Sequence, residues 1–476
     1  MRPTFLLDQH ACIGCHACTV ACKAENDVPL GAFRTWVKWV EHGSYPETTK
    51  SAAVLRCNHC DDAPCVTICP TKALHKRPDG IVDLDDARCI GCASCIQACP
   101  YDAIHIDHRE GTAAKCHFCA HRLEVGLAPA CVSVCPEQAI KVLDRDDPAT
   151  DDLLAAHGAT LRKEERKTIP RTYYVGADPA TLDPLAVDGA RTLSHSEVPD
   201  PMPSHKTLAA KAVYDVPRER YWGSAIAGYL VTKAIAAGAL VLASASQFNS
   251  RLGDAVAANA GFAGLDGAGL LGAISLLFVT LTAILLVADL HKPMRFWYLL
   301  AKPNTKSWLV IGGWILMAHG ALSVAWMAGQ WMPALRAEWL SIISFFVALM
   351  TAVYTAFLFR QARGRELWSE DPTLPLVLVV QMGVATVAVG WLVADIDPIS
   401  GWISIATFLA TMALATFWPQ RTEHARRAHQ WMVRRPLYLA GFVVSGLAIL
   451  WPPIVILAFF LFDFAYVQAG QEVPLS

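Results

Sequence analysis

The pattern of apolar and polar residues divides the chain near residue 220. Beyond that point, long apolar stretches alternate with short polar loops. Stretches of about 20 apolar residues are long enough to cross a bilayer as helices. The pattern predicts eight transmembrane helices, at residues 222–246, 267–289, 308–332, 339–360, 375–394, 401–419, 436–451 and 453–469.

The last two predicted helices are separated only by Trp451-Pro452-Pro453. Proline lacks an N–H group and its ring clashes with the preceding helical turn, so this pair predicts the corner of a hairpin. The alternative is a single kinked helix across residues 437–469, which gives seven spans instead of eight.

Before residue 220, the apolar residues come in short pieces between polar loops. Ile81–Leu84 and Ala103–Ile106 are two such pieces, and they predict small strands. Residues 146–220 are rich in Pro, Asp, Thr and Ala without a helical stripe, so we expect either an irregular arm that wraps the first domain or a flexible linker. The predicted parts are a first domain at 1–145, this arm or linker at 146–220, and a membrane domain at 221–476.

Composition supports the division into two unlike halves. The 476 residues are 54% hydrophobic and only 17% charged, which is too apolar for a soluble protein. The net charge is −2, and no basic patch is interleaved with aromatic residues. We therefore expect no nucleic-acid partner.

All sixteen cysteines lie before residue 136, in four runs of four. The runs are Cys12/Cys15/Cys18/Cys22, Cys57/Cys60/Cys65/Cys69, Cys89/Cys92/Cys95/Cys99 and Cys116/Cys119/Cys131/Cys135. The third run has the C-x2-C-x2-C-x3-C-P spacing of bacterial ferredoxins, in which three close thiolates bind one cluster and the fourth binds its neighbour. The other runs differ from it in the width of a gap or in lacking the proline. The spacing therefore predicts iron–sulfur clusters.

Two other uses of cysteine fit the pattern less well. Structural zinc sites use two separated cysteine pairs and do not need four cysteines within eleven residues. Secreted disulfide domains do not space thiols three apart in repeated fours, and the N-terminal MRPTFLLDQH has no apolar signal segment. We expect cluster ligation to supply much of the folding free energy of this domain.

Charge on the loops indicates an orientation. Three loops that lie on one side of the predicted bundle carry 12 basic residues, namely Lys292, Arg295, Lys302, Lys306, Arg360, Arg363, Arg365, Arg421, Arg426, Arg427, Arg434 and Arg435. The opposite loops carry only Arg251 and Arg336. By the positive-inside rule the basic side is cytoplasmic. The sequence predicts a multi-pass protein of the cell inner (cytoplasmic) membrane, with the cysteine domain and both termini in the cytoplasm.

Both halves of the chain resemble subunits of the complex iron–sulfur molybdoenzymes, a group that contains dimethyl sulfoxide, polysulfide and nitrate reductases and formate dehydrogenases. The cysteine domain resembles their electron-transfer subunit, and the membrane half resembles NrfD-like (polysulfide reductase) membrane subunits. The second resemblance is carried by Tyr229, Ala236-Ala237-Gly238, 289–297, Pro303-Asn304, Ser307-Trp308, Gly312-Gly313-Trp314 and Ala469-Gly470-Gln471. In most such complexes the two parts are separate subunits, whereas here they are fused. His291 departs from the family, which usually has glycine there.

The resemblance implies how the thiols share four clusters. The implied ligand sets are set I (Cys12, Cys15, Cys18, Cys135), set II (Cys22, Cys116, Cys119, Cys131), set III (Cys57, Cys60, Cys65, Cys99) and set IV (Cys69, Cys89, Cys92, Cys95). Because no run has lost a cysteine, four [4Fe–4S] clusters are expected. The implied fold class is an α+β ferredoxin-like four-cluster domain followed by an all-α, eight-helix transmembrane bundle.

Ionisable residues within the predicted helices are candidates for quinone and proton chemistry, because charged groups in lipid are costly and usually functional. The resemblance implies a site for menaquinone or ubiquinone on the cytoplasmic side. The expected quinone-binding residues, which could donate hydrogen bonds or protons to its carbonyls, are Tyr229, Asp289, His291 and Tyr354. The expected proton path is Lys233, His319 and Asp463.

Two simpler roles remain open for these residues. Tyr354 is equally well explained as a packing residue, and Lys233 with His319 as a satisfied polar pair between helices. A b-type haem needs two apposed histidines deep in the bundle, and His319 is the only histidine near mid-membrane. We therefore expect no haem.

The sequence predicts a subunit that relays electrons through four clusters between a cytoplasmic, molybdopterin-containing catalytic subunit and membrane quinone or quinol. The chain has no pterin-binding segment, so we expect it to be a quinone-linked oxidoreductase subunit whose substrate chemistry takes place in that partner. The alternatives are an ion-translocating, proton-pumping module of a larger respiratory complex and the membrane subunit of a hydrogenase.

Overall fold

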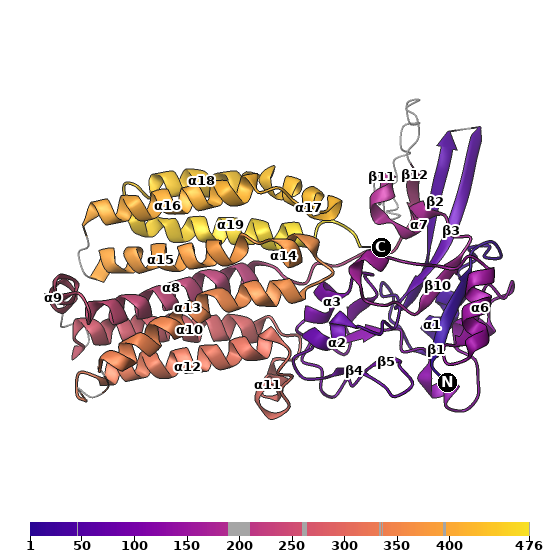
Figure 1. Ribbon diagram of the computed structural model, residues 1–476, viewed down its shortest axis with the longest axis horizontal. Helices are drawn as coiled ribbons and strands as arrows, with labels where there is room; N and C mark the ends of the chain where they lie inside the picture. The colour runs from indigo at the N-terminus through magenta and orange to yellow at the C-terminus, as the bar shows by residue number, and fades with distance from the viewer. Residues whose placement is uncertain are drawn as a thin grey trace. The chain divides into compact units, whose positions relative to one another are not determined.

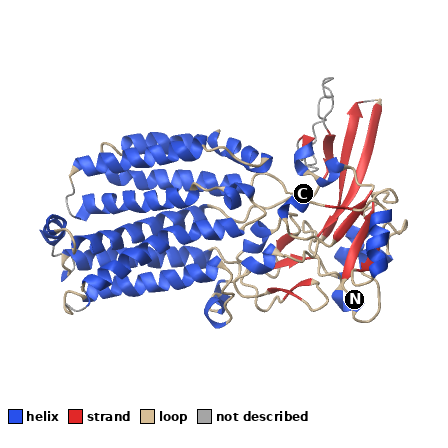
Figure 2. Cartoon of the chain, in the orientation of Figure 1, coloured by secondary structure: helices blue, strands red, loops and turns tan. Residues whose placement is uncertain are grey.

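The computed structural model describes residues 1–44, 46–188, 210–258, 264–332, 335, 337–393 and 397–475. The chain forms two compact units (Figure 1). The N-terminal unit is Met1–Glu219 with Ala362–Gly364 and Pro474–Ser476, and the helical unit is Arg220–Gln361 with Arg365–Val473. Among the described residues, all strands belong to the N-terminal unit (Figure 2).

Two four-stranded sheets organise the N-terminal unit. The first has the order β8-β1-β10-β9, with β8 (Ile140–Asp144) antiparallel and β10 (Thr172–Val175) parallel to β1 (Pro3–Asp8), and β9 (Thr160–Leu161) at the edge. The second has the order β11-β12-β2-β3 and consists of β11 (Val187–Asp188), β12 (Ala210–Tyr214), β2 (Thr35–Ser44) and β3 (Glu47–Arg56). The central β1 is apolar on both faces because both are buried, and Phe5, Leu6 and Leu7 are each at most 2% exposed.

Short hairpins and helices lie between the cysteines. The hairpins pair β4 (Leu74–Lys76) with β5 (Val82–Leu84) and β6 (Ile104–Asp107) with β7 (Thr112–Lys115), which confirms the two small strands predicted from sequence. The helices are α1 (Ala17–Glu25), α2 (Pro64–Ile68), α3 (Ser94–Ala98), α4 (Ala120–Leu123) and α5 (Ala130–Ser133). Such short elements bury little apolar surface, so the cysteine sites must contribute to the stability of this unit.

The segment after residue 145 has more regular structure than an irregular arm. It contains α6 (Pro148–Ala156), η1 (Glu164–Arg166), α7 (Pro179–Leu182) and η2 (Pro184–Ala186) in addition to strands β9 to β12. The four residues Thr172–Val175 are too few for their sequence pattern to predict a strand. They form one because they pair with β1. Residues 189–209 of the predicted arm lie outside the described residues.

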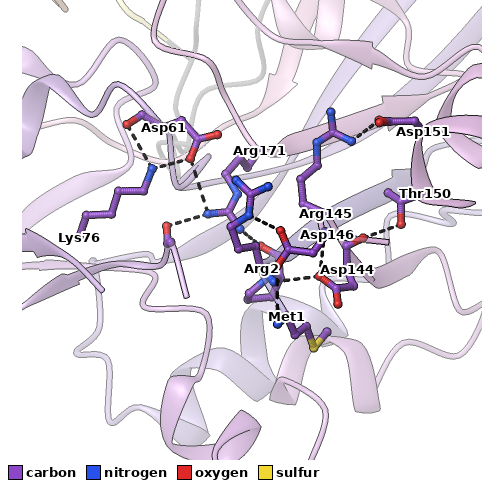
Figure 3. A network of polar contacts seen from close by, with 12 residues as sticks. Met1, Arg2, Asp61, Lys76, Asp144, Arg145, Asp146, Thr150, Asp151 and Arg171 are labelled. Carbon is purple, nitrogen blue, oxygen red and sulfur yellow. Dashed lines mark hydrogen bonds and ion pairs between the residues drawn. The ribbon is translucent and has the colours of Figure 1, made fainter. Parts of the chain in front are cut away.

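A polar network joins the first residues of the chain to the turn after β8 (Figure 3). The backbone N–H of Arg2 donates to the Asp144 carboxylate at 2.8 Å, and Arg2 Nε donates to Asp146 at 2.5 Å. Thr150 Oγ1 donates to the Asp144 carbonyl at 2.6 Å. Exposed ion pairs of this kind contribute little stability, so the network mainly fixes the position of the N-terminus against β8 and α6.

Seven segments of the helical unit are long and apolar enough to cross a membrane. They are α8 (Ser224–Ser246), α10 (Gly267–Ala288), α12 (Trp308–Ala328), α13 (Glu338–Gln361), α15 (Leu374–Val393), α16 (Pro398–Phe417) and Pro452–Gly470, which comprises η6 (Pro452–Ile454) and α19 (Val455–Gly470). Short elements connect them, namely α9 (Ser250–Ala258), η4 (Pro293–Arg295), α11 (Tyr298–Ala301), α14 (Glu366–Glu370) and α17 (Glu423–Val433). The helical unit is therefore a membrane domain.

The predicted span at 436–451 is shorter than expected, because α18 is helical only at Pro436–Leu447. At about 1.5 Å per residue its 12 residues extend roughly 18 Å, less than a full bilayer core. It is nevertheless separate from α19, since the ring of Phe442 lies 5.0 Å and that of Tyr438 lies 5.1 Å from the Phe462 ring. The segment is thus a hairpin turned at Trp451–Pro453, and the alternative of one kinked helix is wrong.

The two ends of the helical unit meet. Gln471 Oε1 accepts from the backbone N–H groups of Tyr221 and Trp222 at 3.2 and 3.1 Å, and Gln471 Nε2 donates to the Trp222 carbonyl at 2.7 Å. A chain that enters and leaves a bundle at the same end traverses it an even number of times. The short α18 therefore acts as the eighth traverse.

Helix α8 lies at the centre of the bundle. It packs on α10, α13, α15 and α19. In its apolar 18-residue stretch 83% of the residues are buried, against 28% in α10 and in α16. Helices α8, α10, α12 and α13 form one four-helix group, and α15, α16, α18 and α19 form a second (Figure 1). A Cβ added to Gly238 would lie 2.7 Å from the backbone nitrogen of Thr386, so glycine lets α8 and α15 approach closely.

Candidate functional site

The four cysteine runs fold in the same way. The second residue after the first cysteine has a positive φ in every run, at Gly14 (65°), His59 (43°), Gly91 (67°) and Phe118 (62°). This backbone region is uncommon for residues other than glycine and is maintained where function requires it. Each run therefore turns back on itself immediately after its first cysteine.

The thiols gather into the four predicted groups of four. Enclosed cavities are lined by all members of set I, of set II and of set IV. In set III, Cys60 interacts electrostatically with Cys57 and Cys99, and Cys65 interacts with these three. The last cysteine of each run lies with three cysteines of another run, as shared cubanes require.

Backbone N–H groups point at the thiols. Ala113 donates to Cys89 at 3.4 Å, Leu74 to Cys69 at 3.4 Å, and Ala139 to Cys135 at 3.3 Å. Such donors stabilise sulfur in its anionic form and tune the potential of a cluster. The surroundings are otherwise apolar, and burial raises the pKa of Cys18 and of Cys99 to about 11. Iron is therefore needed to hold these thiols as thiolates.

The thiol groups do not fit a single metal ion. Among the described residues, which include all sixteen cysteines, no three His, Cys, Asp or Glu side chains converge closely enough to bind one ion. A zinc site brings four ligands to one centre, whereas the four thiolates of a cubane each bind a different iron and lie farther apart. The grouping of three cysteines of one run with the last cysteine of another is the arrangement that shared [4Fe–4S] clusters require.

A second group of functional side chains lies inside the helical unit, between α8 and α13. Lys233 is 1% exposed, and its Nζ donates to the Ala352 carbonyl at 3.0 Å and to Thr355 Oγ1. The same Nζ lies 4.8 Å from the ring centre of Tyr354 and 5.8 Å from that of Tyr229. Two of the predicted quinone-binding residues, Tyr229 and Tyr354, thus lie around the amine of Lys233, a predicted proton-path residue.

Asp463 on α19 belongs to the same interior. It is 6% exposed, and its Oδ1 accepts from Gln381 Nε2 at 2.9 Å. Asp463 also interacts electrostatically with Lys233 and with Tyr229. Its Oδ2 and Gln381 Oε1 have no hydrogen-bond partner within the described part of the chain.

His319 does not hydrogen-bond to Lys233. Its Nε2 hydrogen-bonds with Ser275 Oγ at 2.9 Å and its Nδ1 with Thr351 Oγ1 at 3.0 Å. Ser275 in turn hydrogen-bonds with Ser323 Oγ at 2.9 Å. His319 and Lys233 nevertheless both bind α13, at Thr351 and Thr355, which lie one helical turn apart.

The remaining two predicted residues lie at the bundle end where Gln471 binds Trp222. Asp289 caps the end of α10 and interacts electrostatically with Tyr229. The His291 ring lies 6.1 Å from the Tyr221 ring, in the loop that follows α10. The structure therefore groups Asp289 with Tyr229 and places His291 beside Tyr221.

An apolar cavity of about 480 Å³ reaches this group from the surface formed by α12, α13 and α15. Its lining residues are Trp308, Ile315, Leu349, Met350, Val353, Tyr354, Phe357, Pro375, Leu376 and Val379. Tyr354 is 3% exposed. The volume is in the range of small-molecule sites, and the phenol is one of the few polar groups in the lining.

Two motifs gain a physical reason here. A Cβ on Gly312 would lie 2.3 Å from the Tyr354 ring, so Gly312 makes room for that ring. A Cβ on Gly470 would lie 2.1 Å from the Trp368 ring, and Gln471 holds the start of α8. The sequence did not predict four polar residues of the membrane helices, because single hydroxyl or amide groups in a helix have no distinctive pattern. They are Thr351, Thr355, Ser275 and Gln381. It also did not predict Arg56, which immediately precedes the second cysteine run.

Comparison with known families defines the class of protein. Residues 51–145 match the family described as a 4Fe-4S dicluster domain, and residues 214–461, more than half of the chain, match the family described as polysulphide reductase, NrfD. The protein is an iron–sulfur electron-transfer subunit with a membrane anchor in the same polypeptide. It belongs to the NrfD polysulphide reductase family.

Curated relatives agree with this class. The protein is 46% identical over 190 residues to a subunit of the tetrathionate reductase of Salmonella typhimurium, covering 39% of this sequence and 76% of the relative. It is 48% identical over 139 residues to the thiosulfate reductase electron transfer subunit of Salmonella typhi, covering 29% and 72%. It is 33% identical over 230 residues to the arsenate respiratory reductase iron-sulfur subunit of a Shewanella species, covering 37% and 96%.

Proposed function

We propose that the protein relays electrons through four [4Fe–4S] clusters between a catalytic partner and membrane quinone. The observation that carries this proposal is the presence, in one polypeptide, of four groups of four thiols and of a buried Tyr229, Lys233, Tyr354 and Asp463 group beside an apolar cavity. The clusters are bound by sets I to IV. The fused membrane domain makes the quinone reaction part of the same polypeptide.

The quinone reaction needs two electrons and two protons, together with hydrogen bonds to the carbonyl oxygens. Tyr354, at the inner wall of the apolar cavity, would donate a hydrogen bond to a menaquinone or ubiquinone ring. Lys233 contacts the rings of both Tyr354 and Tyr229. Asp463 and Asp289 would exchange protons with the quinone. His291, in the loop beside Tyr221, would contribute a further hydrogen-bond or proton donor to the quinone site.

The catalytic partner is proposed to be a molybdopterin-containing subunit. The three relatives are named as parts of reductases of tetrathionate, thiosulfate and arsenate, two of them as the electron-transfer or iron-sulfur subunit. Native purification with mass and elemental analysis tests this partner. A large subunit with molybdenum or tungsten supports it, whereas a nickel-containing partner would favour the hydrogenase alternative.

The bundle end with Gln471 is proposed to face the cytoplasm of an inner membrane. The three basic loops lie at this end. Trp308 at the start of α12 donates to Gln361 at the end of α13 at 2.9 Å, the Trp368 ring lies 5.4 Å from the Trp222 ring, and Arg220 lies 6.0 Å from the Trp431 ring. Arg336 of the opposite loops lies outside the described residues. The positive-inside rule then makes the basic end cytoplasmic.

Haem is not proposed. Both ring nitrogens of His319 are hydrogen-bonded, to Ser275 and to Thr351. The purified protein is expected to lack a reduced b-type absorption band, and such a band would overturn this point.

Proton translocation is a second candidate function, because a polar track crosses the first four-helix group. Ser323, Ser275, His319 and Thr351 follow one another by hydrogen bonds. Thr355 lies one helical turn after Thr351 on α13 and accepts a hydrogen bond from Lys233 of α8. Hydroxyl and imidazole groups in such a row can pass protons. Proton uptake measured across liposomes during quinone-linked turnover separates the two functions, since a simple anchor consumes protons on one side only.

A further inference from the structure

Arg56 is a fully buried cation between two thiol sets. It ends β3 immediately before Cys57, and its side chain is 0% exposed. The guanidinium carbon lies 4.2 Å from the centre of the Phe5 ring, and Nη1 donates to Cys131 Sγ at 3.3 Å. Nε and Nη2 have no hydrogen-bond partner within the described residues. An arginine cannot lose its charge, so a compensating negative charge must be nearby.

Two other buried arginines of this unit are compensated differently. Arg171 donates to the Gly80 carbonyl at 2.8 Å and to the Pro3 carbonyl at 2.7 Å, and Asp61 lies 3.8 Å away (Figure 3). Arg162 donates to the Leu182 carbonyl at 2.9 Å. Backbone oxygens and a carboxylate therefore solvate these charges, whereas Arg56 has a thiol as its hydrogen-bond acceptor.

The groups that act electrostatically on Arg56 are thiols of two sets. They are Cys131 and Cys116 of set II and Cys18 of set I, and no carboxylate of the described residues is among the main interactions. A [4Fe–4S] cluster with four thiolates has a net charge of about −2 when oxidised and about −3 when reduced. The cluster is thus the anion that this buried cation lacks, and the attraction is greater in the reduced state.

A second arginine adds to the same cavity. Arg34 lines the cavity of set II together with Arg56, and its buried Nε also has no hydrogen-bond partner in the part of the chain that the structure describes. The cavity of set IV is different. Among the described residues, its lining contains no charged side chain apart from the cysteines themselves.

Building on the proposed cluster ligation, we propose that Arg56 is a shared redox-tuning cation that raises the reduction potentials of the clusters at sets I and II. Reduction adds one electron to a cluster, delivered by a neighbouring cluster, and takes up no proton because Arg56 already supplies the positive charge. Arg34 adds to the effect at set II alone. Arg56 is a positioning and tuning residue and does not ligate iron.

The test is a potentiometric titration of the full-length protein in detergent, followed by electron paramagnetic resonance with dithionite as reductant. Arg56→Met is compared with wild type after iron content has been shown to be equal. We expect two of the four clusters to show at least a tenfold fall in the ratio of reduced to oxidised cluster at fixed ambient potential, which is a shift of about 59 mV for a one-electron couple. Arg56→Lys keeps the charge and should shift less.

Arg171→Met is the matched control, because it removes an equally buried guanidinium whose partners are mainly carbonyls. It should lower thermal stability and leave all four potentials unchanged. If Arg56→Met loses iron, Arg56→Gln replaces it, because it removes the charge and keeps a hydrogen-bond donor, and it should lower the potentials of the same two clusters. Arg34→Met should lower the potential of one cluster. Unchanged potentials, or an equal shift of all four clusters, would overturn the proposal. A wild-type protein without [4Fe–4S] signals would instead overturn the proposed function itself.

Discussion

The ammonium nitrogen of Lys233 lies 4.8 Å from the centre of the Tyr354 ring. Lys233 comes from α8 and Tyr354 from α13, so the contact links the central helix to the wall of the apolar cavity. A buried cation over an aromatic face is stabilised most where water is excluded. A quinone in the cavity would therefore contact Tyr354, whose ring also contacts the Lys233 side chain.

Lys233→Met is expected to slow quinone-linked turnover by at least tenfold, equivalent to about 1.4 kcal/mol of activation free energy. The reason is that the variant removes the charge that would stabilise a reduced quinone beside Tyr354. Dye-linked reduction of the clusters should stay unchanged, because the dye bypasses the membrane domain. Steady-state assays with a short-chain quinol and with a dye measure the two rates.

Lys302→Met is the control for the loss of a positive charge, since Lys302 lies in the exposed loop after α11. It should leave both rates close to wild type. Loss of both activities in Lys233→Met would mean that this residue has only a structural role. An unchanged quinone rate would remove it from the proposed site.

Adjacent glycines on α12 offer a matched pair. A Cβ on Gly312 would lie 2.3 Å from the Tyr354 ring, whereas a Cβ on Gly313 meets no atom within 4 Å. Gly312→Ala should displace the ring and raise the KM for quinol several-fold. It should also lower the free energy of unfolding by about 1–3 kcal/mol, as overpacking does. Gly313→Ala should keep wild-type kinetics and gain slightly in stability, because alanine is the better helix former. Equal behaviour of the two variants would contradict this assignment.

The grouping of the thiols could be predicted from sequence through the resemblance, and the structure brings the members of sets I, II and IV together in the same cavities. The spacing of cluster ligands is a local pattern, so the eleven residues from Cys89 to Cys99 are enough to predict a cluster-binding loop. The position of the membrane helices was also predictable, since length and hydropathy determine it. The shortness of α18 was not, because apolar residues continue through 448–451 while the helix ends at Leu447.

The membrane interior shows where sequence reasoning fails. Lys233 and His319 were found because charged and titratable residues are rare in apolar helices. Their partners Thr351 and Thr355 were not, since a threonine in a helix more often bonds its own backbone, as Thr351 does to the Val347 carbonyl at 2.8 Å. Arg56 was missed because arginine is usually an exposed residue and only the fold shows it to be enclosed.

Stability of the N-terminal unit should rise with pH between about 8 and 10. Lys38 on β2 is 2% exposed, and burial lowers its pKa to about 8 from an unfolded value near 10.4. Within this window the unfolded state takes up more protons than the folded one, so the free energy of unfolding increases as pH rises. Below pH 8 the full cost, about 3 kcal/mol, is present.

Lys38→Met should therefore raise the temperature at which the visible absorbance of the clusters is lost at pH 7, and should remove most of the increase between pH 8 and 10. Lys50→Met is the control, since Lys50 is exposed and forms an ion pair with Glu41 at 3.7 Å. If Lys38→Met instead lowers the melting temperature at pH 7 and leaves its pH dependence unchanged, burial of Lys38 does not destabilise the folded protein, and this prediction is wrong.

The even number of traverses makes a topological prediction. Gln471 binds the backbone of Trp222, so the segment before α8 and the segment after α19 lie at the same end of the bundle. A reporter fused after Ser476 and one inserted before Tyr221 should read the same side, and by the positive-inside rule we expect that side to be the cytoplasm. A reporter inserted between α9 and α10 should read the opposite side. If the first two reporters read opposite sides, α18 does not complete a traverse, and the contact between Gln471 and Trp222 cannot exist in the membrane.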